Sequence, residues 1–302
     1  MIEGQEGVTW EQWLALALAT EDAGLGGLFR SDHYRSIVRG EPAGSLDAWA
    51  TLAALAARTD RIRLGTMVSP VTFRHASVLA KNAVTVDHVS GGRVELGIGA
   101  GWYEAEHDSY GFPFGTQRAR LDELDRQLAE IVRQWTEADD VRPAPLQQPR
   151  PPIIVGGKAK PRTVAAAIRH ADEYNTTFPS VEEARERATV VAEAAHAAGR
   201  QREPRPQPGE QGAFVGQGEP VVRMTGCVVG RDDAEVRERL AVWRKVTRGG
   251  DEPPIRGTVD EVASQLHDYE AVGVERAMLQ HLVHEDVEMV TLLGEVAVQL
   301  AA

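Results

Sequence analysis

The chain has 302 residues, of which 42% are hydrophobic and 26% charged, and a formal net charge of -12 at pH 7. This balance is typical of a globular protein, and the length suits one α/β barrel, which needs roughly 250 residues. The acidic charge disfavours nucleic acid and anionic membranes as partners. A single cysteine excludes an internal disulfide, and the absence of a signal peptide or membrane-length apolar stretch predicts a cytoplasmic protein.

Helical and strand-like segments alternate along the first half of the chain, as in a parallel sheet with helical crossovers. Thr9 and Gln12 form a capping box that begins the first helix, and Gly24 ends it. A Pro-rich connector covers residues 142–152. The other elements predicted here are strand 27–30, helix 46–58, strand 62–67, helix 77–88, strand 94–98, helix 117–135 and strand 153–157.

The second half continues the alternation and completes one domain, residues 1–302. Its predicted elements are helix 180–198, strand 222–229, helices 234–246 and 259–272, strand 276–279 and a closing helix from residue 286. Residues 201–220 interrupt the pattern because they are rich in Pro, Gly and Gln. We expect a mobile surface insertion there, either a bare linker or an active-site lid.

The first strand is unusually short. An eight-stranded barrel needs a full strand before its first helix, but only the stub Met1-Ile2-Glu3 is present. Either the start codon lies upstream of Met1, which is our hypothesis, or the strand is only two or three residues long. In the second case the neighbouring strands would have unpaired edges.

A glycine run ends the strand at 94–98 and is followed by two aromatic residues, Trp102 and Tyr103. In a parallel barrel such strand ends meet at one mouth, where the reactive groups lie. Glycine allows positive φ and close backbone approach, so the run could bind a flat ligand between apolar walls, or simply form a tight turn. The dinucleotide-binding pattern G-x-G-x-x-G is not met, because the third glycine is missing and no helix is expected to open there.

His33 follows the strand at 27–30 and is the candidate for proton transfer, because its ordinary pKa lies near neutrality. The alternative is a hydrogen-bonded scaffold residue, and we expect Asp32 to be structural. His281 and His284 could line the mouth or merely cap a loop. The His and Cys residues lack metal-ligand spacing, and no Gly-x-Ser-x-Gly elbow is present, so we expect neither a metal site nor a serine nucleophile.

A Gly-Gly turn precedes Lys158 at the end of the strand at 153–157, and Lys160 and Arg162 follow at the start of a helix. Backbone amides of such a turn, together with a helix N-terminus and basic side chains, suit a phosphate group. A plain turn before a helix is the alternative.

Five segments in the same order and spacing resemble the luciferase-like monooxygenase superfamily, and most of all its F420-dependent oxidoreductase branch. They are GLFRSDHY (27–34), LGTMVSPVTFRH (64–75), LGIGAGWYEAEH (96–107), PPIIVGGKAKPRT (151–163) and GVERAMLQHLVH (273–284). The resemblance covers residues 1 to about 175 and about 224 to the end. It implies an α/β fold, a (β/α)8 TIM barrel, that forms a homodimer and binds coenzyme F420, or alternatively FMN, at its mouth.

The resemblance also implies roles for individual residues. His33 matches the active-site histidine of the family, with Asp32 as its neighbour in the catalytic group. Thr66 and Met67 match the site of a non-prolyl cis peptide that supports the cofactor ring. The implied contacts to the ring edge and ribityl chain are Gly99, Ala100, Gly101 and Trp102. The implied contacts to the phosphate are Val155, Gly156, Gly157 and Lys158.

Two departures from sugar-phosphate-oxidising relatives make that activity doubtful. A Trp shortly after the histidine is replaced by Ile37 or a neighbour, and a Glu directly after the glycine run is replaced by Trp102. Glu104 and Glu106 could supply a carboxylate instead, or only begin a helix.

Three functions remain open. The first is an F420-dependent oxidoreductase that acts on a small organic substrate. The second is an FMN-dependent monooxygenase that uses reduced flavin and oxygen, and the third is a non-catalytic cofactor-binding protein. The F420 tail carries extra carboxylates and should require positive charge at the rim, for which Arg35, Arg39 and Arg74 are candidates.

Overall fold

The computed structural model describes residues 1–40, 43–200 and 221–301, so the insertion expected at 201–220 lies outside the described residues. The strands are β1 (Gly27–Arg30), β2 (Arg63–Thr66), β3 (Ser69–Pro70), β4 (Val94–Gly99), β5 (Ile153–Gly157), β6 (Glu173–Thr177), β7 (Val221–Gly230), β8 (Ile255–Thr258) and β9 (Val274–Gln280). The helices are η1 (Gly4–Glu6), α1 (Trp10–Asp22), α2 (Ala48–Ala56), α3 (Ala76–Ser90), α4 (Glu104–Tyr110), α5 (Gln117–Thr136), α6 (Pro161–His170), α7 (Val181–Ala197), α8 (Asp233–Val246), α9 (Val259–Glu270) and α10 (Val287–Leu300).

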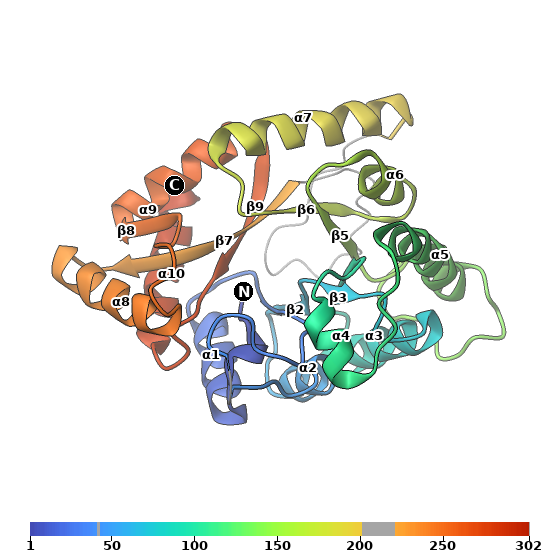
Figure 1. Cartoon of the computed structure of the whole chain (residues 1–302), viewed down its shortest axis with the longest axis horizontal. Helices are drawn as coiled ribbons and strands as arrows, with labels where there is room; N and C mark the ends of the chain where they lie inside the picture. The colour runs from blue at the N-terminus through green and yellow to red at the C-terminus, as the bar shows by residue number, and fades with distance from the viewer. Residues whose placement is uncertain (41–42, 201–220, 302) are drawn as a thin grey trace.

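The strands form one curled parallel sheet with the helices around its outside (Figure 1). Pairing runs β1-β2-β4-β5-β6-β7 and continues from β7 to β9, while β8 pairs with the far end of β7. Ile2 then pairs with Arg30 at the end of β1 and with His281 just after β9. The predicted barrel is therefore confirmed, with a single residue bridging the place of its first strand.

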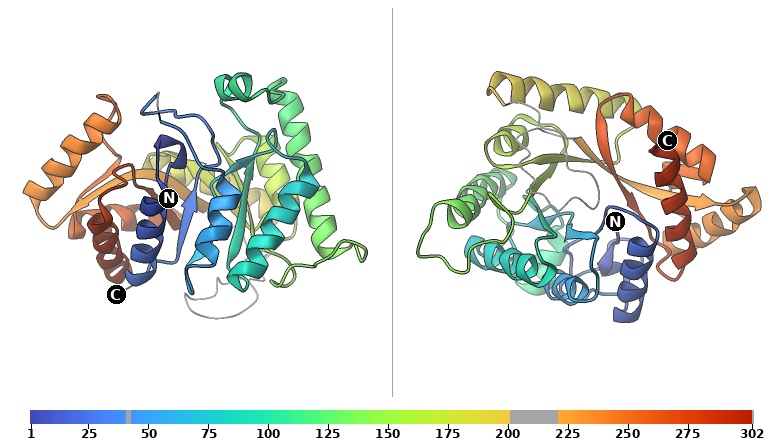
Figure 2. Two further views of the ribbon diagram at one scale, coloured as in Figure 1. Left: turned by 90° about the horizontal axis from the view of Figure 1, so that it is seen from below. Right: turned by 180° about the vertical axis from the view of Figure 1, so that it is seen from behind.

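The short first strand is held by backbone hydrogen bonds to both neighbours. The Ile2 amide donates to the Phe29 carbonyl at 2.8 Å, and the Met1 ammonium donates to the Leu279 carbonyl at 2.9 Å. The His281 amide completes the set by donating to the Met1 carbonyl at 2.9 Å. Figure 2 shows the N-terminus between the blue strand β1 and the red C-terminal elements. In the chain as given, Met1 and Ile2 therefore take the place of the first strand.

The barrel interior is layered by polarity. Met1, Phe29, Met67, Ile154 and Met278 form an apolar cluster within it. Toward the N-terminal ends of the strands, the Arg276 guanidinium lies 2.8 Å from a Glu95 oxygen and 3.0 Å from a Glu173 oxygen. Both carboxylates are almost fully buried, so pairing with arginine is what makes their burial tolerable.

Packing explains two glycines of the run that ends β4. A Cβ on Gly97 would lie 2.0 Å from the Thr66 carbonyl oxygen, and one on Gly99 would lie 2.7 Å from a Val68 methyl. Side chains are excluded at these positions because β4 contacts the chain that leaves β2. The expectation that no helix opens after the run is wrong, since α4 begins at Glu104.

We predict that Gly97→Ala destabilises the fold, because its methyl group would overlap backbone that cannot move freely. The free energy of unfolding should fall by about 3 kcal/mol in urea denaturation. Gly26→Ala is the matched control, since a Cβ there meets nothing within 4 Å and the change should stay within about 0.5 kcal/mol. Equal stability of the two variants would contradict the packing role of Gly97.

Candidate active site

Two buried carboxylates, Glu6 and Glu106, hold the loop that leaves β1 at the barrel mouth. Glu6 precedes this loop in the chain, and Glu106 follows it. Glu6 accepts from the Ser36 hydroxyl and from the amides of Ile37, Val38 and Arg39. Glu106, on α4, accepts from the amides of Tyr34 and Arg35. Because backbone amides near the barrel interior need acceptors, these carboxylates fix the loop in one conformation.

Glu106 also contacts His33, with its Oε2 2.8 Å from the imidazole Nδ1. The Glu106 side chain is fully buried, whereas 15% of the His33 side chain remains exposed. Burial alone would lower the pKa of His33, but the hydrogen bond and charge of Glu106 outweigh it and raise the pKa above its usual value. The pairing leaves Nε2 as the free end of the ring, so His33 can hold a proton there near neutral pH.

Asp32 is engaged in a separate network. Its Oδ2 accepts from Arg74 and from the Ser69 hydroxyl, each at 2.6 Å, and its side chain is 1% exposed. Arg74 also pairs with Asp47 at 2.7 Å. The structure therefore does not bring Asp32 to the exposed side of His33, and its contacts are those of a residue that anchors the β1 loop to the segment after β2.

Aromatic packing fixes α4, which carries Glu106. His107 donates or accepts at both ring nitrogens, with Nε2 2.6 Å from the Thr72 hydroxyl and Nδ1 2.8 Å from the Tyr103 carbonyl. Phe73 and Phe112 stack beside it, with ring centroids 4.8 Å apart. This packing matters because α4 is short and has no side-chain cap at its start.

Trp102 forms an exposed wall next to His33. The indole is 62% exposed, stacks on Tyr103 at 5.3 Å and meets the His33 ring edge-on at 6.0 Å. Gly101, before it, has φ +78°, a conformation that glycine adopts without strain, and Ala100 is half-buried. Such an exposed aromatic beside a titratable ring is a surface on which a planar ligand can lie.

The non-prolyl cis peptide lies between Met67 and Val68, one bond later than the Thr66–Met67 bond that the resemblance implied. Thr66 still belongs to β2, pairs with Arg30 and donates from its hydroxyl to the Gly97 carbonyl at 2.8 Å, so the chain leaves the strand only after it. Val68 then packs against Gly97 and Gly99 inside the barrel.

The residues expected to bind phosphate at the end of β5 lie in two different environments. Val155 is buried in the strand, Gly156 lies against Val68, and a Cβ on Gly157 would lie 2.4 Å from the Tyr174 hydroxyl. The glycines thus have packing reasons of their own. Lys158 is exposed and takes part in no ion pair of the described residues.

Two further basic residues lie near the start of α6. Lys160 precedes Pro161 at a helix start that has no side-chain cap, and it is exposed. Arg162 already pairs with Asp122. Of the three basic residues in this segment, Lys158 and Lys160 are therefore the ones whose charge is available to an anion.

His281 and His284 are buried after β9. The pKa of His281 is lowered to about 4 and that of His284 to about 3, in both cases mainly by burial. Both rings are therefore neutral at physiological pH. In the part of the chain that the structure describes, no hydrogen bond reaches either ring nitrogen of His284.

The sequence predicted His33 at the mouth, and the structure places it in the loop after β1, but the role of its partner was missed. Glu106 was one of two carboxylates noted after the glycine run, and only the burial of one face of α4 distinguishes it from the exposed Glu104. Glu6 gave no comparable signal, because its hydrogen-bond donors follow it by 30 residues or more. Within residues 1–40, 43–200 and 221–301, no group of three or more His, Cys, Asp or Glu side chains is arranged to hold a metal ion. In the same ranges, each helix is too short or too polar to span a bilayer.

A parallel barrel with a carboxylate-paired histidine and exposed aromatics at its mouth is the architecture of an α/β-barrel enzyme. The match to known proteins is more specific: residues 2–297 fit the family described as luciferase-like monooxygenase, and the chain belongs to it. This family consists of flavin- or F420-dependent oxidoreductases.

Individual relatives are more distant. The uncharacterized protein Rv0953c of Mycobacterium tuberculosis is 34% identical over 147 residues, which are 44% of this chain and 50% of that protein, so the chain spans about half the length of this curated relative. Rv3520c of the same organism is provisionally named a coenzyme F420-dependent oxidoreductase and is 35% identical over 43% of this chain and 33% of its own length. The solved F420-dependent tetrahydromethanopterin reductase of Methanopyrus kandleri shares the fold, with a TM-score of 0.77 and 17% identity over 99% of this chain and 97% of that one.

We predict that Glu106→Gln lowers the pKa of His33, because the charge that offsets burial is removed. An NMR titration of the His33 ring should show this shift, while Glu104→Gln, an exposed neighbour on the same helix, should leave the pKa unchanged.

The same pair has a defined effect on stability. Because the pKa of His33 is raised in the folded state, the pair stabilises the fold fully below about pH 6.5, the ordinary pKa of histidine. This stabilisation is lost as the pH rises through the pKa of the folded state. The difference in unfolding free energy between the wild type and Glu106→Gln should therefore shrink at alkaline pH. A difference that grows with pH would contradict the pairing.

Proposed function

We propose that the chain is an oxidoreductase that binds coenzyme F420 at the barrel mouth and exchanges a hydride with a small organic substrate. The observation that carries this proposal is the His33–Glu106 pair, which places a proton-holding ring at the surface beside Trp102. Family membership supports the cofactor class. The homodimer and the cytoplasmic location belong to the same proposal.

The residues present fit a deazaflavin or flavin. Trp102 offers an exposed flat surface, and Gly101 and Ala100 carry no bulk beside it. Lys158 and Lys160 would hold the phosphate, together with the amides near Gly156 and Gly157 at the end of β5. Thr66 and Met67 at the end of β2, and Gly99 at the end of β4, would contact the ring, whereas the Val155 side chain packs in the outer core and would offer only its backbone.

When bound, the cofactor supplies the hydride chemistry, and this chain supplies orientation and proton handling. Glu106 fixes the tautomer and direction of the His33 ring through Nδ1. His33 Nε2 then gives a proton to the substrate oxygen as hydride arrives, or takes one as hydride leaves. Asp32 would be a positioning residue, because its ion pair with Arg74 holds the loop that carries His33.

Charge at the rim favours F420 over FMN. Of the three arginines expected to meet the F420 tail, Arg74 is already paired with Asp32 and Asp47. The guanidinium groups of Arg35 and Arg39 donate only to carbonyl and hydroxyl oxygens and take part in no ion pair within the described ranges. Two cations in the loop after β1 that form no ion pair suit the extra carboxylates of the deazaflavin tail.

Titration of the purified protein with F420 and, separately, with FMN tests the cofactor. We expect saturable quenching of F420 fluorescence and weaker binding of FMN, with Arg35→Gln and Arg39→Gln reducing F420 affinity more than FMN affinity. Tighter binding of FMN, with oxygen-dependent turnover of reduced FMN, would instead support the monooxygenase. Binding of either cofactor without turnover of any substrate would favour a cofactor carrier.

We predict that His33→Ala lowers turnover of reduced F420 by roughly 100-fold while the Kd of the cofactor stays nearly unchanged. The assay uses the best acceptor from a panel of small enones, ketones and quinones. His267→Ala, an exposed histidine on α9, serves as the control. Unchanged turnover in His33→Ala would remove His33 from the mechanism.

We also predict that Lys158→Ala weakens F420 binding by roughly tenfold, because a charge-assisted contact to phosphate is lost. Lys158 is the better position for this test than Gly157, where any side chain would collide with Tyr174 and disturb the fold as well. Lys245→Ala on α8 is a surface control. Equal affinity in Lys158→Ala would place the phosphate elsewhere.

A further inference from the structure

Asn175, in β6, carries a polar atom that no part of the described chain satisfies. The residue is 2% exposed, and its Oδ1 is buried without a hydrogen-bond partner among the described residues. Buried amide groups are nearly always hydrogen-bonded, because an unpaired polar atom away from water is costly. The Asn175 amide therefore indicates that a partner from outside the chain binds here.

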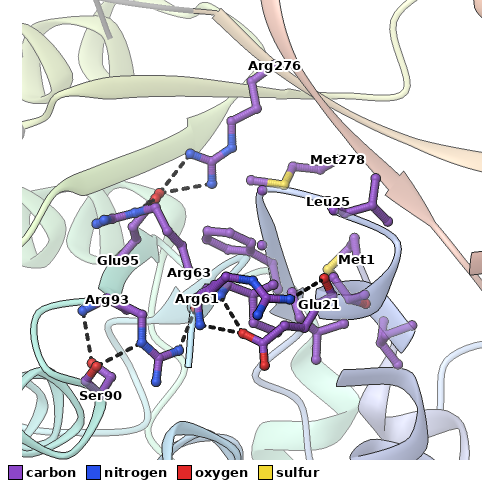
Figure 3. A pocket seen from close by; sticks show the side chains of 18 of the residues that line it. Met1, Glu21, Leu25, Arg61, Arg63, Ser90, Arg93, Glu95, Arg276 and Met278 are labelled. Carbon is purple, nitrogen blue, oxygen red and sulfur yellow. Dashed lines mark hydrogen bonds and ion pairs between the residues drawn. The ribbon is translucent and has the colours of Figure 1, made fainter. Parts of the chain in front are cut away.

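The ion pairs at the other end of the strands show which way the Asn175 side chain points. Glu173, two residues earlier on β6, pairs with Arg276 at 3.0 Å inside the barrel. Figure 3 shows the pair of Arg276 with Glu95 beside a cavity of about 1100 Å³ toward the N-terminal ends of the strands. Residues two apart on a strand face the same side, so Asn175 faces the barrel interior as Glu173 does, but nearer the mouth.

Gly156 and Val68 lie beside the Asn175 amide. Gly156 of β5 is the residue that pairs with Asn175 of β6, and a Cβ on Gly156 would lie 3.7 Å from Asn175 Nδ2. The same Cβ would lie 3.4 and 3.6 Å from the two methyl groups of Val68, in the segment that leaves β2. The amide therefore lies next to the residues that are proposed to contact the cofactor ring.

Among the four glycines that end β4 and β5, Gly156 has the weakest packing reason to be a glycine. At Gly97, Gly99 and Gly157 a Cβ would lie 2.0 to 2.7 Å from another atom, whereas at Gly156 its neighbours would be at ordinary van der Waals distance. Gly156 also lacks a positive φ, and it is partly exposed although it faces the barrel interior. The space that a side chain would fill is therefore open, next to the unpaired amide.

We propose that Asn175 binds the pyrimidine edge of the cofactor ring, with Oδ1 accepting from the ring N3–H group and Nδ2 donating to a carbonyl oxygen next to it. An amide carries a donor and an acceptor side by side, which complements an N–H group flanked by carbonyls. F420 and FMN share this edge, so the assignment rests on the proposed class of cofactor but not on the choice between the two. The open space beside Gly156 gives the ring access to the amide.

A trapped water molecule would also satisfy the Asn175 amide, and the two partners predict different behaviour. A contact through N3 is lost when that nitrogen carries a methyl group, because methylation removes the donor and adds bulk at one atom only. If water alone fills the position, Asn175 has no part in distinguishing the N3–H ring from the N3-methyl ring. The preference between the two rings, compared with and without the amide, therefore separates the two cases.

The test measures the Kd of four compounds, namely FMN, 5-deaza-FMN and the N3-methyl derivative of each. The wild type should bind the N3–H form of the tighter ring at least roughly tenfold more tightly than the N3-methyl form. Asn175→Ala should bind the N3–H form roughly tenfold more weakly than the wild type and lose the preference, because the acceptor is gone and the methyl group has room. Asn82→Ala, on the outer helix α3, is the control and should behave as the wild type.

Gly156→Ala is the second variant, because it fills the open space and keeps the amide. Its methyl group would meet atoms only at ordinary contact distance, so the Tm of the free protein should fall by no more than about 3 °C. Both rings should nevertheless bind at least roughly tenfold more weakly. NMR of a bound ring labelled with 15N at N3 adds a readout besides affinity, since the N3 proton should exchange with solvent more slowly in the wild type than in Asn175→Ala.

Two results would overturn the assignment and leave the cofactor class intact. One is the same preference for the N3–H ring, and the same exchange of the N3 proton, in the wild type and Asn175→Ala. The other is unchanged ring affinity in Gly156→Ala. Failure of the wild type to bind either ring would instead overturn the cofactor class itself, and the assignment with it.

Discussion

The constraint on which the site depends is the need of buried backbone amides for acceptors. Glu6 and Glu106 meet this need for the loop after β1, one from the segment before α1 and the other from α4. Because the same Glu106 also binds His33, the carboxylate that orders the loop orients the ring and raises its pKa. The conformation of the loop at Tyr34 and Arg35 and the pKa of His33 therefore depend on the same buried carboxylate.

Polar and apolar side chains occupy different levels along the barrel axis. The N-terminal ends of the strands hold the Arg276, Glu95 and Glu173 pairs, and an apolar cluster around Met278 lies inside the barrel. The mouth carries the titratable ring and the exposed Trp102. The Arg276 pairs neutralise one another, whereas the guanidinium groups of Arg35 and Arg39 at the mouth form no ion pair within the described residues.

The glycines of the β4 run show how one motif can satisfy two demands. Gly97 and Gly99 are small because Val68 and the Thr66 carbonyl occupy the space where their side chains would lie. Gly101 is a glycine for its positive φ, which turns the chain so that Trp102 faces solvent. The first part of the run is thus a packing feature of the barrel, and only its last residue shapes the mouth directly.

The sequence by itself determined the barrel, its short first strand and the position of His33, because these follow from local periodicity and from the rule that parallel strand ends share a mouth. The short strands β6 and β8 and the helix α4 escaped it, since a few residues carry little periodic signal. Only the tertiary structure decided that Glu106, rather than Glu104, reaches His33 and that Arg74 pairs with Asp32. Each of these depends on contacts between segments far apart in the chain, where charge pairing and packing, rather than sequence pattern, select the partner.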